Sequence, residues 1–127
     1  MTSHQDPVAI VQSFCDSWAV GDLDAMVEYF TDDAVYHNIP IAPVTGRSAI
    51  RDTIAGFTAG VDTVEFRVLH IAASGSVVLT ERVDGFVTPT VTIELPVMGT
   101  FEVVDGKIAA WRDYFDLNQF MSQLPQN

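Results

Sequence analysis

Residues 76–87, SVVLTERVDGFV, read as a β-strand in which an arginine and an aspartate interrupt an apolar run. Residues i and i+2 of a strand share a face, so Arg82 and Asp84 point to the same side. If that side faces the core, two opposite charges are buried together. If it faces solvent, they form an ordinary surface ion pair that contributes little to stability. The buried side of this strand therefore decides how the rest of the chain packs.

The neighbouring segments predict an antiparallel sheet around this strand. Residues 63–73 alternate apolar with polar side chains, and residues 90–104 form a third strand. Asp105-Gly106 is a strong hairpin signal that leads into a last strand over residues 107–116. Short turns join antiparallel neighbours, so the second half of the chain is expected to form a meander.

The first half of the chain is predicted to be helical. Asp6-Pro7 places an N-cap before a proline at the first helical position, and Gly21 ends the helix that follows. The other predicted elements are a helix over residues 23–30, a turn at 31–33, an extended segment at 34–43, a helix after Gly46 with Ser48 as a possible cap, and a closing helix over 117–124.

Helices that lead and strands that follow indicate the α+β class, here as one domain over residues 1–127. We expect a curved, mostly antiparallel sheet with the N-terminal helices packed over it. Such an arrangement forms a cone, and the inside of the cone is an apolar pocket.

Strand parity assigns two alternative interiors to this cone. One choice gathers apolar side chains from three strands inside and also brings in three charged ones. The members of this set are Phe86, Leu95, Val97, Phe115, Arg82, Asp84 and Asp113. The opposite choice buries Glu81 with Val83 and Leu79. The pattern favours the first interior, but both faces of residues 76–87 are partly apolar, so parity alone leaves the second open.

Composition and charge exclude several classes of function. The net charge is −11, with 6 Lys and Arg against 17 Asp and Glu, and such a surface repels nucleic acid and anionic membranes. No apolar run reaches the length of a membrane span, and the N-terminus lacks the layout of a signal peptide, so a cytoplasmic location is expected. The lone Cys15 is expected to pack in the core, and no histidine pair predicts a metal site.

Asp84, Arg82 and Asp113 would have a specific chemistry if they met in an apolar pocket. Desolvation and mutual repulsion would push the pKa values of the two carboxyl groups upward. An arginine between them can bind both, and the pair can then share one proton. One carboxylic acid and one carboxylate near neutral pH can act as general acid and general base. The alternative is a purely structural ion cluster, although buried charge is costly and rarely needed for stability.

Tyr36 and Asn38 extend this candidate site. They stand two residues apart on an extended segment, so both can face the same cavity, whereas His37 between them points away. A phenol and a carboxamide can hold a water molecule beside a carboxylate that takes its proton. The alternative is that both residues belong only to a turn.

Four stretches together resemble the limonene-1,2-epoxide hydrolases in order and spacing. They are VYHNIPIAP at residues 35–43, TGRSAI at 45–50, TERVD at 80–84, and the run from Gly99 through WRDYFDLNQF to Phe120. This family belongs to a wider group of cone-shaped α+β folds that includes nuclear transport factor 2, ketosteroid isomerase and polyketide cyclases of the SnoaL type. The resemblance covers nearly the whole chain.

The resemblance implies a one-step hydrolysis of an epoxide to a diol without a cofactor. Asp113 matches the general base of the family, and Tyr36 and Asn38 match the residues that hold the attacking water. Asp84 matches the acid that protonates the epoxide oxygen, and Arg82 matches the bridge between the two carboxylates. A homodimer formed through the outer face of the sheet is expected by the same analogy.

The rest of the pocket then needs only to be apolar, to accept a terpene-like or alicyclic epoxide. The candidate pocket residues are Trp18, Phe57, Phe86, Leu95, Val97, Phe115 and Phe120. Two other functions remain open on this fold. One is an enzyme like ketosteroid isomerase or a polyketide cyclase, and the other is a binding module without catalysis that would leave the three charged residues without a role.

Overall fold

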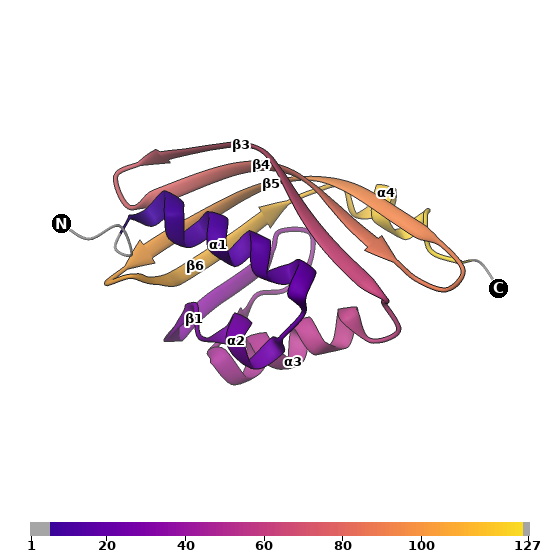
Figure 1. The fold of residues 1–127 in the computed structure, drawn as a ribbon, viewed down its shortest axis with the longest axis horizontal. Coiled ribbons are helices and arrows are strands. Elements are labelled where there is room, and N and C mark those ends of the chain that lie inside the picture. The colour runs from indigo at the N-terminus through magenta and orange to yellow at the C-terminus, as the bar shows by residue number, and fades with distance from the viewer. Residues whose placement is uncertain (1–5, 126–127) are drawn as a thin grey trace.

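The computed structural model describes residues 6–125. In chain order its elements are α1 (Pro7–Val20), α2 (Leu23–Val27), β1 (Phe30–Asn38), β2 (Val44–Thr45), α3 (Arg47–Thr58), β3 (Thr63–Ser74), β4 (Val77–Val87), β5 (Thr92–Val104), β6 (Lys107–Tyr114) and α4 (Leu117–Met121). Figure 1 shows a curled sheet with α1 lying across one face, α2 and α3 beside β1, and α4 at the far end of the sheet. The α+β class predicted from the sequence is confirmed.

The sheet has six strands in the order β2-β1-β6-β5-β4-β3. Strands β3 to β6 form the predicted antiparallel meander, with β5 between β4 and β6. The short β2 pairs antiparallel with β1, and β1 pairs parallel with β6. This parallel pair places the N-terminal strand beside the C-terminal one, so that Tyr36 lies opposite Trp111 and Asn38 opposite Asp113.

The predicted helix over residues 23–30 and the predicted turn at 31–33 are wrong in part. The helix ends at Val27, and Phe30 already begins β1. Phe30 pairs with Ile108 of β6, and the Ile108 amide donates to the Tyr29 carbonyl at 2.7 Å. Pairing between distant segments therefore overrides the local helical pattern.

The cap of the third helix also differs from the prediction. Gly46, and not Ser48, is the N-cap of α3, and its φ of 96° lies in the region that favours glycine. The Gly46 amide donates to Ala34 O at 2.8 Å, which ties the start of α3 to β1.

The first of the two parity choices for β4 is confirmed. Arg82 and Asp84 are buried together with Thr80, whereas Leu79 on the opposite face is exposed. Parity fails at one point in β6, because the register with β5 shifts at Ala109. As a result Ile108 and Trp111, three residues apart, are both fully buried.

Aromatic rings fill the cone between α1 and the sheet. Trp111 of β6 is completely buried and stacks on Tyr36, with 4.1 Å between the ring centroids. Phe14 of α1 meets the edge of Trp111 at 5.1 Å, and Trp18 stacks on Phe66 of β3 at 4.2 Å. This core supports the sheet from which the charged side chains project.

Candidate active site

Three charged side chains from two strands meet inside the cone. Arg82 and Asp84 project from β4, and Asp113 projects from β6, on the two sides of β5. Their exposed fractions are 1%, 4% and 3%. The structure thus brings together the trio that the sequence could place only by parity.

Arg82 binds both carboxylates at once. Its Nε donates to Asp84 Oδ1 at 2.9 Å and its Nη2 to Asp84 Oδ2 at 2.8 Å. On the other side Nη2 donates to Asp113 Oδ2 at 2.8 Å and Nη1 to Asp113 Oδ1 at 3.2 Å. Nη1 also donates to Thr80 Oγ1 at 3.1 Å. The planar guanidinium therefore makes a bidentate contact with each of the two acids, which the ammonium group of a lysine cannot do.

Gly99 of β5 leaves the space in which this cluster sits. It lies opposite Thr80 in the pairing with β4 and opposite Asp113 in the pairing with β6. A Cβ at this position would lie 2.7 Å from Asp113 Oδ1 and 2.8 Å from Thr80 Oγ1, and nearer still to Arg82 Nη1. The strand between the two acids therefore has to carry no side chain here. The sequence analysis assigned Gly99 no role in the site.

The surroundings of Arg82 keep its guanidinium group charged. Burial would lower its pKa, but the carboxylates of Asp113 and Asp84 offset this effect and raise the pKa well above its ordinary value. The guanidinium carbon also lies 4.6 Å from the centroid of the Phe66 ring, which favours a cation. Arg82 is thus a permanent cation between the acids.

The environments of the two acids differ. Desolvation raises the pKa of Asp84 to about 6, against the lowering effect of its bonds with Arg82. Asp113 receives an additional donor, because Trp111 Nε1 donates to its Oδ1 at 2.7 Å. Donors to a carboxylate stabilise its charged form. The raised pKa of Asp84 favours its protonated form, and the Trp111 N–H fixes the orientation of the Asp113 carboxylate.

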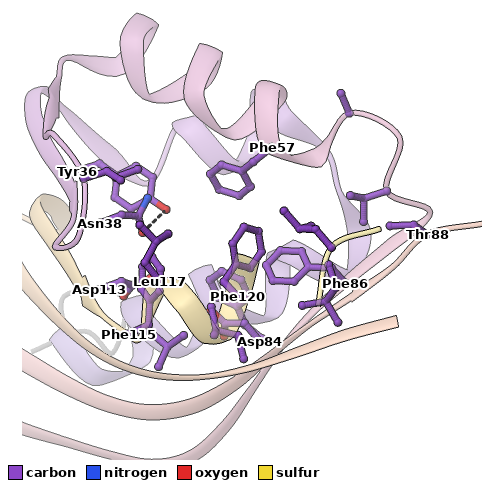
Figure 2. A pocket seen from close by; sticks show the side chains of 18 residues that line it. Tyr36, Asn38, Phe57, Asp84, Phe86, Thr88, Asp113, Phe115, Leu117 and Phe120 are labelled. Carbon is purple, nitrogen blue, oxygen red and sulfur yellow. Dashed lines mark hydrogen bonds between the residues drawn. The ribbon is translucent and has the colours of Figure 1, made fainter. Parts of the chain in front are cut away.

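Tyr36 and Asn38 lie beside Asp113 and face the same cavity (Figure 2). The Tyr36 hydroxyl donates to Asn38 Oδ1 at 3.2 Å. Burial, together with the charge of Asp113, raises the pKa of Tyr36 well above its ordinary value, so the phenol keeps its proton. His37 is outside the site, and its Nε2 lies 2.9 Å from the carbonyl oxygen of Ile41.

A cavity of about 330 Å³ opens onto Asp84 and Asp113. Figure 2 shows Phe57 on one side and Phe86, Phe115 and Phe120 on the other. The residues that line it are Tyr36, Asn38, Ile41, Phe57, Ala59, Val61, Phe66, Asp84, Phe86, Thr88, Ile93, Leu95, Val97, Asp113, Phe115, Leu117, Phe120 and Leu124. Most are apolar, and Tyr36, Asn38 and Asp113 lie together on one side of the cavity.

Six of the seven predicted apolar pocket residues line this cavity, and Trp18 does not. Trp18 is 2% exposed and lies behind the cavity wall, where it stacks on Phe66 and Phe57. The reason is that α1 packs across β3, so its inner face meets the back of the Phe66 ring. The sequence analysis missed Phe66, Ile93 and Leu117, although strand alternation and the predicted closing helix were usable signals. It could not find Ile41, Ala59, Val61 or Thr88 in loops and turns, and Leu124 lies beyond the end of α4, which is shorter than the helix predicted over 117–124.

Cys15 lies outside the cavity. It is buried in the core, and desolvation raises the pKa of its thiol to about 12. Between residues 6 and 125, no group of three or more His, Cys, Asp or Glu side chains could hold a metal ion. None of the helices described is long and apolar enough to cross a membrane.

Fold and site together define a class of protein. It is an α+β cone whose apolar cavity ends at a buried Asp–Arg–Asp cluster next to a tyrosine and an asparagine. Comparisons with known proteins show the family. A model of the limonene-1,2-epoxide hydrolase catalytic domain matches residues 5–126.

Two relatives support the match. The epoxide hydrolase EphG of Mycobacterium tuberculosis is 35% identical over 109 residues, which are 84% of this chain and 71% of EphG. A solved structure of an M. tuberculosis LEH-like epoxide hydrolase has a TM-score of 0.82 at 30% identity and covers 93% of this chain and 88% of its own. The chain therefore belongs to the limonene-1,2-epoxide hydrolase family, and the resemblance drawn from the sequence is confirmed.

More distant structures share the fold alone. A putative polyketide cyclase from Xanthomonas campestris pv. campestris has a TM-score of 0.85 at 22% identity and covers 96% of this chain and 98% of its own. The cone predicted from the order of helices and strands is thus an architecture that proteins of different names share.

Proposed function

We propose that this protein is an epoxide hydrolase that adds water to a small apolar epoxide, terpene-like or alicyclic, and gives a vicinal diol in one step. Membership of the family and the likeness to EphG support epoxide hydrolase activity in general. The observation that carries the finer proposal is the pair of two-bond contacts of Arg82, which holds two buried carboxylates beside an apolar cavity, one of them with a raised pKa.

In the proposed reaction Asp113 is the general base and Asp84 the general acid. A water held by Tyr36 and Asn38 gives a proton to Asp113 as its oxygen attacks a ring carbon. Protonated Asp84 gives its proton to the epoxide oxygen as the carbon–oxygen bond breaks, so no free hydroxide or alkoxide forms. Afterwards a proton has moved from Asp84 to Asp113, and its return restores the pair. Each positioned proton transfer is worth roughly 100- to 10,000-fold in rate.

Arg82 has two tasks in this mechanism. It stabilises whichever carboxylate is charged, and it fixes the distance between acid and base. Because its bidentate contacts hold both groups in place before substrate binds, little reorganisation is needed during the reaction.

The cavity supports a neutral, apolar guest of modest size. A volume of about 330 Å³ is at the lower end of ligand pockets, which are typically about 300–1,000 Å³. Its wall carries no cation among the described residues, and Arg82 is already bound to both acids. Burial of the guest against aromatic rings would provide most of the binding free energy.

The decisive experiment is diol formation from a panel of cyclic and linear epoxides, with the wild type and Asp113→Asn. We expect turnover by the wild type and a loss of more than about 100-fold in the variant. The variant keeps the shape of the side chain, so its folding can be checked by circular dichroism. Diol formation at the wild-type rate by Asp113→Asn would contradict the role of the base.

Isotope labelling tests the one-step course. In a single turnover in heavy-oxygen water, the label should enter the diol directly. Label found first in Asp113 or Asp84 would mean a covalent ester, and the proposed mechanism would be wrong.

We also propose a homodimer formed through the outer face of the sheet, and a cytoplasmic location. Exposed apolar side chains on this face, including Leu79, Met98 and Tyr114, support such a contact. Sedimentation velocity of the purified protein tests it, and a monomer at all micromolar concentrations would contradict it.

A further inference from the structure

One wall of the cavity is made by a segment that is too short to be stable by itself. Leu117, Phe120 and Leu124 line the cavity, and α4 spans only Leu117–Met121. Isolated helices of this length do not persist in water. The α4 wall, defined here as residues 117–124, must therefore be held by contacts with the rest of the protein.

Gln123 supplies the polar part of this attachment. Its Nε2 donates to Glu94 O at 2.9 Å, and its Oε1 accepts from Glu94 N at 3.1 Å. Nε2 also donates to Gln119 O at 3.0 Å, which fixes the carboxamide on its own turn. The side chain of Gln123 thus pairs with Glu94 as the backbone of a neighbouring strand would.

The position of Glu94 explains why it is free to pair in this way. Strand β6 ends at Tyr114, opposite Met98, so the part of β5 that contains Glu94 has no β6 neighbour. Instead the chain turns into the α4 wall, and Gln123 occupies the open edge of β5. Ile93 and Leu95, on either side of Glu94, line the cavity, so the attachment lies directly at the cavity wall.

We infer that Gln123 is a specificity-determining residue. Its hydrogen bonds with Glu94, here called the clip, attach the α4 wall to β5 and so limit the size of the epoxide that fits. With the clip in place, Phe120 stays against Phe86 on the same side of the cavity, with 6.4 Å between the ring centroids. Without it, the wall moves outward and larger guests are admitted. The kinetic part of this inference rests on the proposed function, and the structural part does not.

Hydrogen exchange tests the clip directly. In Gln123→Ala, which removes the acceptor of the Glu94 N–H, the Glu94 amide should exchange about tenfold faster, and in Gln123→Glu, which keeps this acceptor but loses both donors, it should exchange faster by a smaller factor. Gln119→Ala is the matched control, since its exposed side chain lies on the same helix and its backbone carbonyl is retained. An unchanged exchange rate at Glu94 in both Gln123 variants would overturn the inference.

Substrate selection tests the consequence. The ratio of kcat/KM for 4-phenylcyclohexene oxide to that for cyclohexene oxide should rise by about tenfold in Gln123→Ala and stay at the wild-type value in Gln119→Ala. An unchanged ratio in Gln123→Ala, together with faster exchange at Glu94, would show a clip without influence on specificity and would also overturn the inference.

A binding measurement separates this inference from the proposed function. If the wild type hydrolyses no epoxide, the proposed function fails, and the test then uses the corresponding trans diols as inert guests. The dissociation constant of the phenyl-substituted diol, relative to that of cyclohexane-1,2-diol, should fall about tenfold in Gln123→Ala. A constant ratio would overturn the inference whatever the activity.

Discussion

At the scale of single residues, the site depends on the hydrogen bonds that one guanidinium and one indole donate to the two carboxylates. Arg82 makes four hydrogen bonds to two carboxylates, and Trp111 adds a fifth bond to one of them. Buried charges of this kind are tolerated only when all partners are present, since removal of one partner of a buried ion pair costs about 3–5 kcal/mol. Substitutions that keep charge or shape and remove one bond are therefore the informative ones.

Arg82→Lys should lower kcat/KM for the best epoxide by about 100-fold or more, because an ammonium cannot make two bidentate contacts. The same change on the outer face of the sheet, Arg112→Lys, is the control, since in the described part of the chain Arg112 forms its ion pair with the half-exposed Glu102. Steady-state kinetics on both variants measures the difference. Near-normal turnover by Arg82→Lys would count against the bridge.

Trp111→Phe should keep the ring that stacks on Tyr36 and lose the donor to Asp113 Oδ1. We expect kcat to fall about tenfold in steady-state kinetics, because the Asp113 carboxylate loses a donor that holds it in place.

Trp18→Phe is the matched control for that loss of kcat. Trp18 is also buried, and within the described structure its Nε1 has no hydrogen-bond partner, so the same substitution removes no bond. Both variants should lose stability through the smaller ring, but only Trp111→Phe should lower kcat. An equal fall of kcat in both would contradict the positioning role of the Trp111 N–H.

At the scale of elements, β5 is the spacer between the acid and the base. It holds β4 and β6 in register so that Gly99 lies opposite both Thr80 and Asp113. Two strands that flank a third are about 10 Å apart, and only a long side chain such as that of Arg82 can cross this distance. Because Gly99 has no side chain, the side chain of Arg82 can cross β5 at this position.

Gly99→Ala should therefore disrupt the cluster. Its Cβ would collide with the side chains of Arg82, Thr80 and Asp113, and overpacking of this kind costs about 1–3 kcal/mol. We expect a lower melting temperature and a loss of activity of about 100-fold or more, measured by calorimetry and by diol formation.

Gly85→Ala in β4 is the control for this substitution. Its Cβ would make ordinary contacts, with Glu65 O and Ile93 O both at 3.9 Å. We expect wild-type activity in this variant. Equal losses of activity in the two glycine variants would show that an added methyl group is harmful anywhere in the sheet. The special role of Gly99 at the cluster would then be contradicted.

At the scale of the whole molecule, the buried acid links folding to pH. The pKa of Asp84 is raised by burial from 3.8 to about 6, so between these values the folded protein holds a proton that the unfolded chain has released. The stabilising contribution of this group is fully present below pH 4 and is lost as the pH rises through about 6.

The unfolding free energy of the wild type should thus fall, relative to that of Asp84→Asn, by about 1–3 kcal/mol between pH 4 and pH 7. Urea denaturation at a series of pH values measures this difference. The exposed Asp52→Asn serves as control and should parallel the wild type. A relative stability that rises with pH over this interval would contradict the raised pKa of Asp84.

The sequence by itself determined the order of the elements and the character of the site. Proline and aspartate caps, glycine turns and alternation predicted helices first and a meander after, and period-two alternation placed Arg82, Asp84 and Phe86 on one face. These are local signals, because backbone propensity and face parity depend only on neighbouring residues.

Only the tertiary structure decided which face is buried and what completes the site. The end of α2 at Val27, the bulge at Ala109, the position of Trp18 behind the cavity wall and the pairing of Gln123 with Glu94 all depend on contacts between distant segments. The same holds for the meeting of Asp113 with Arg82 across the space left by Gly99. Such contacts follow from packing and strand register, which no local pattern in one chain specifies.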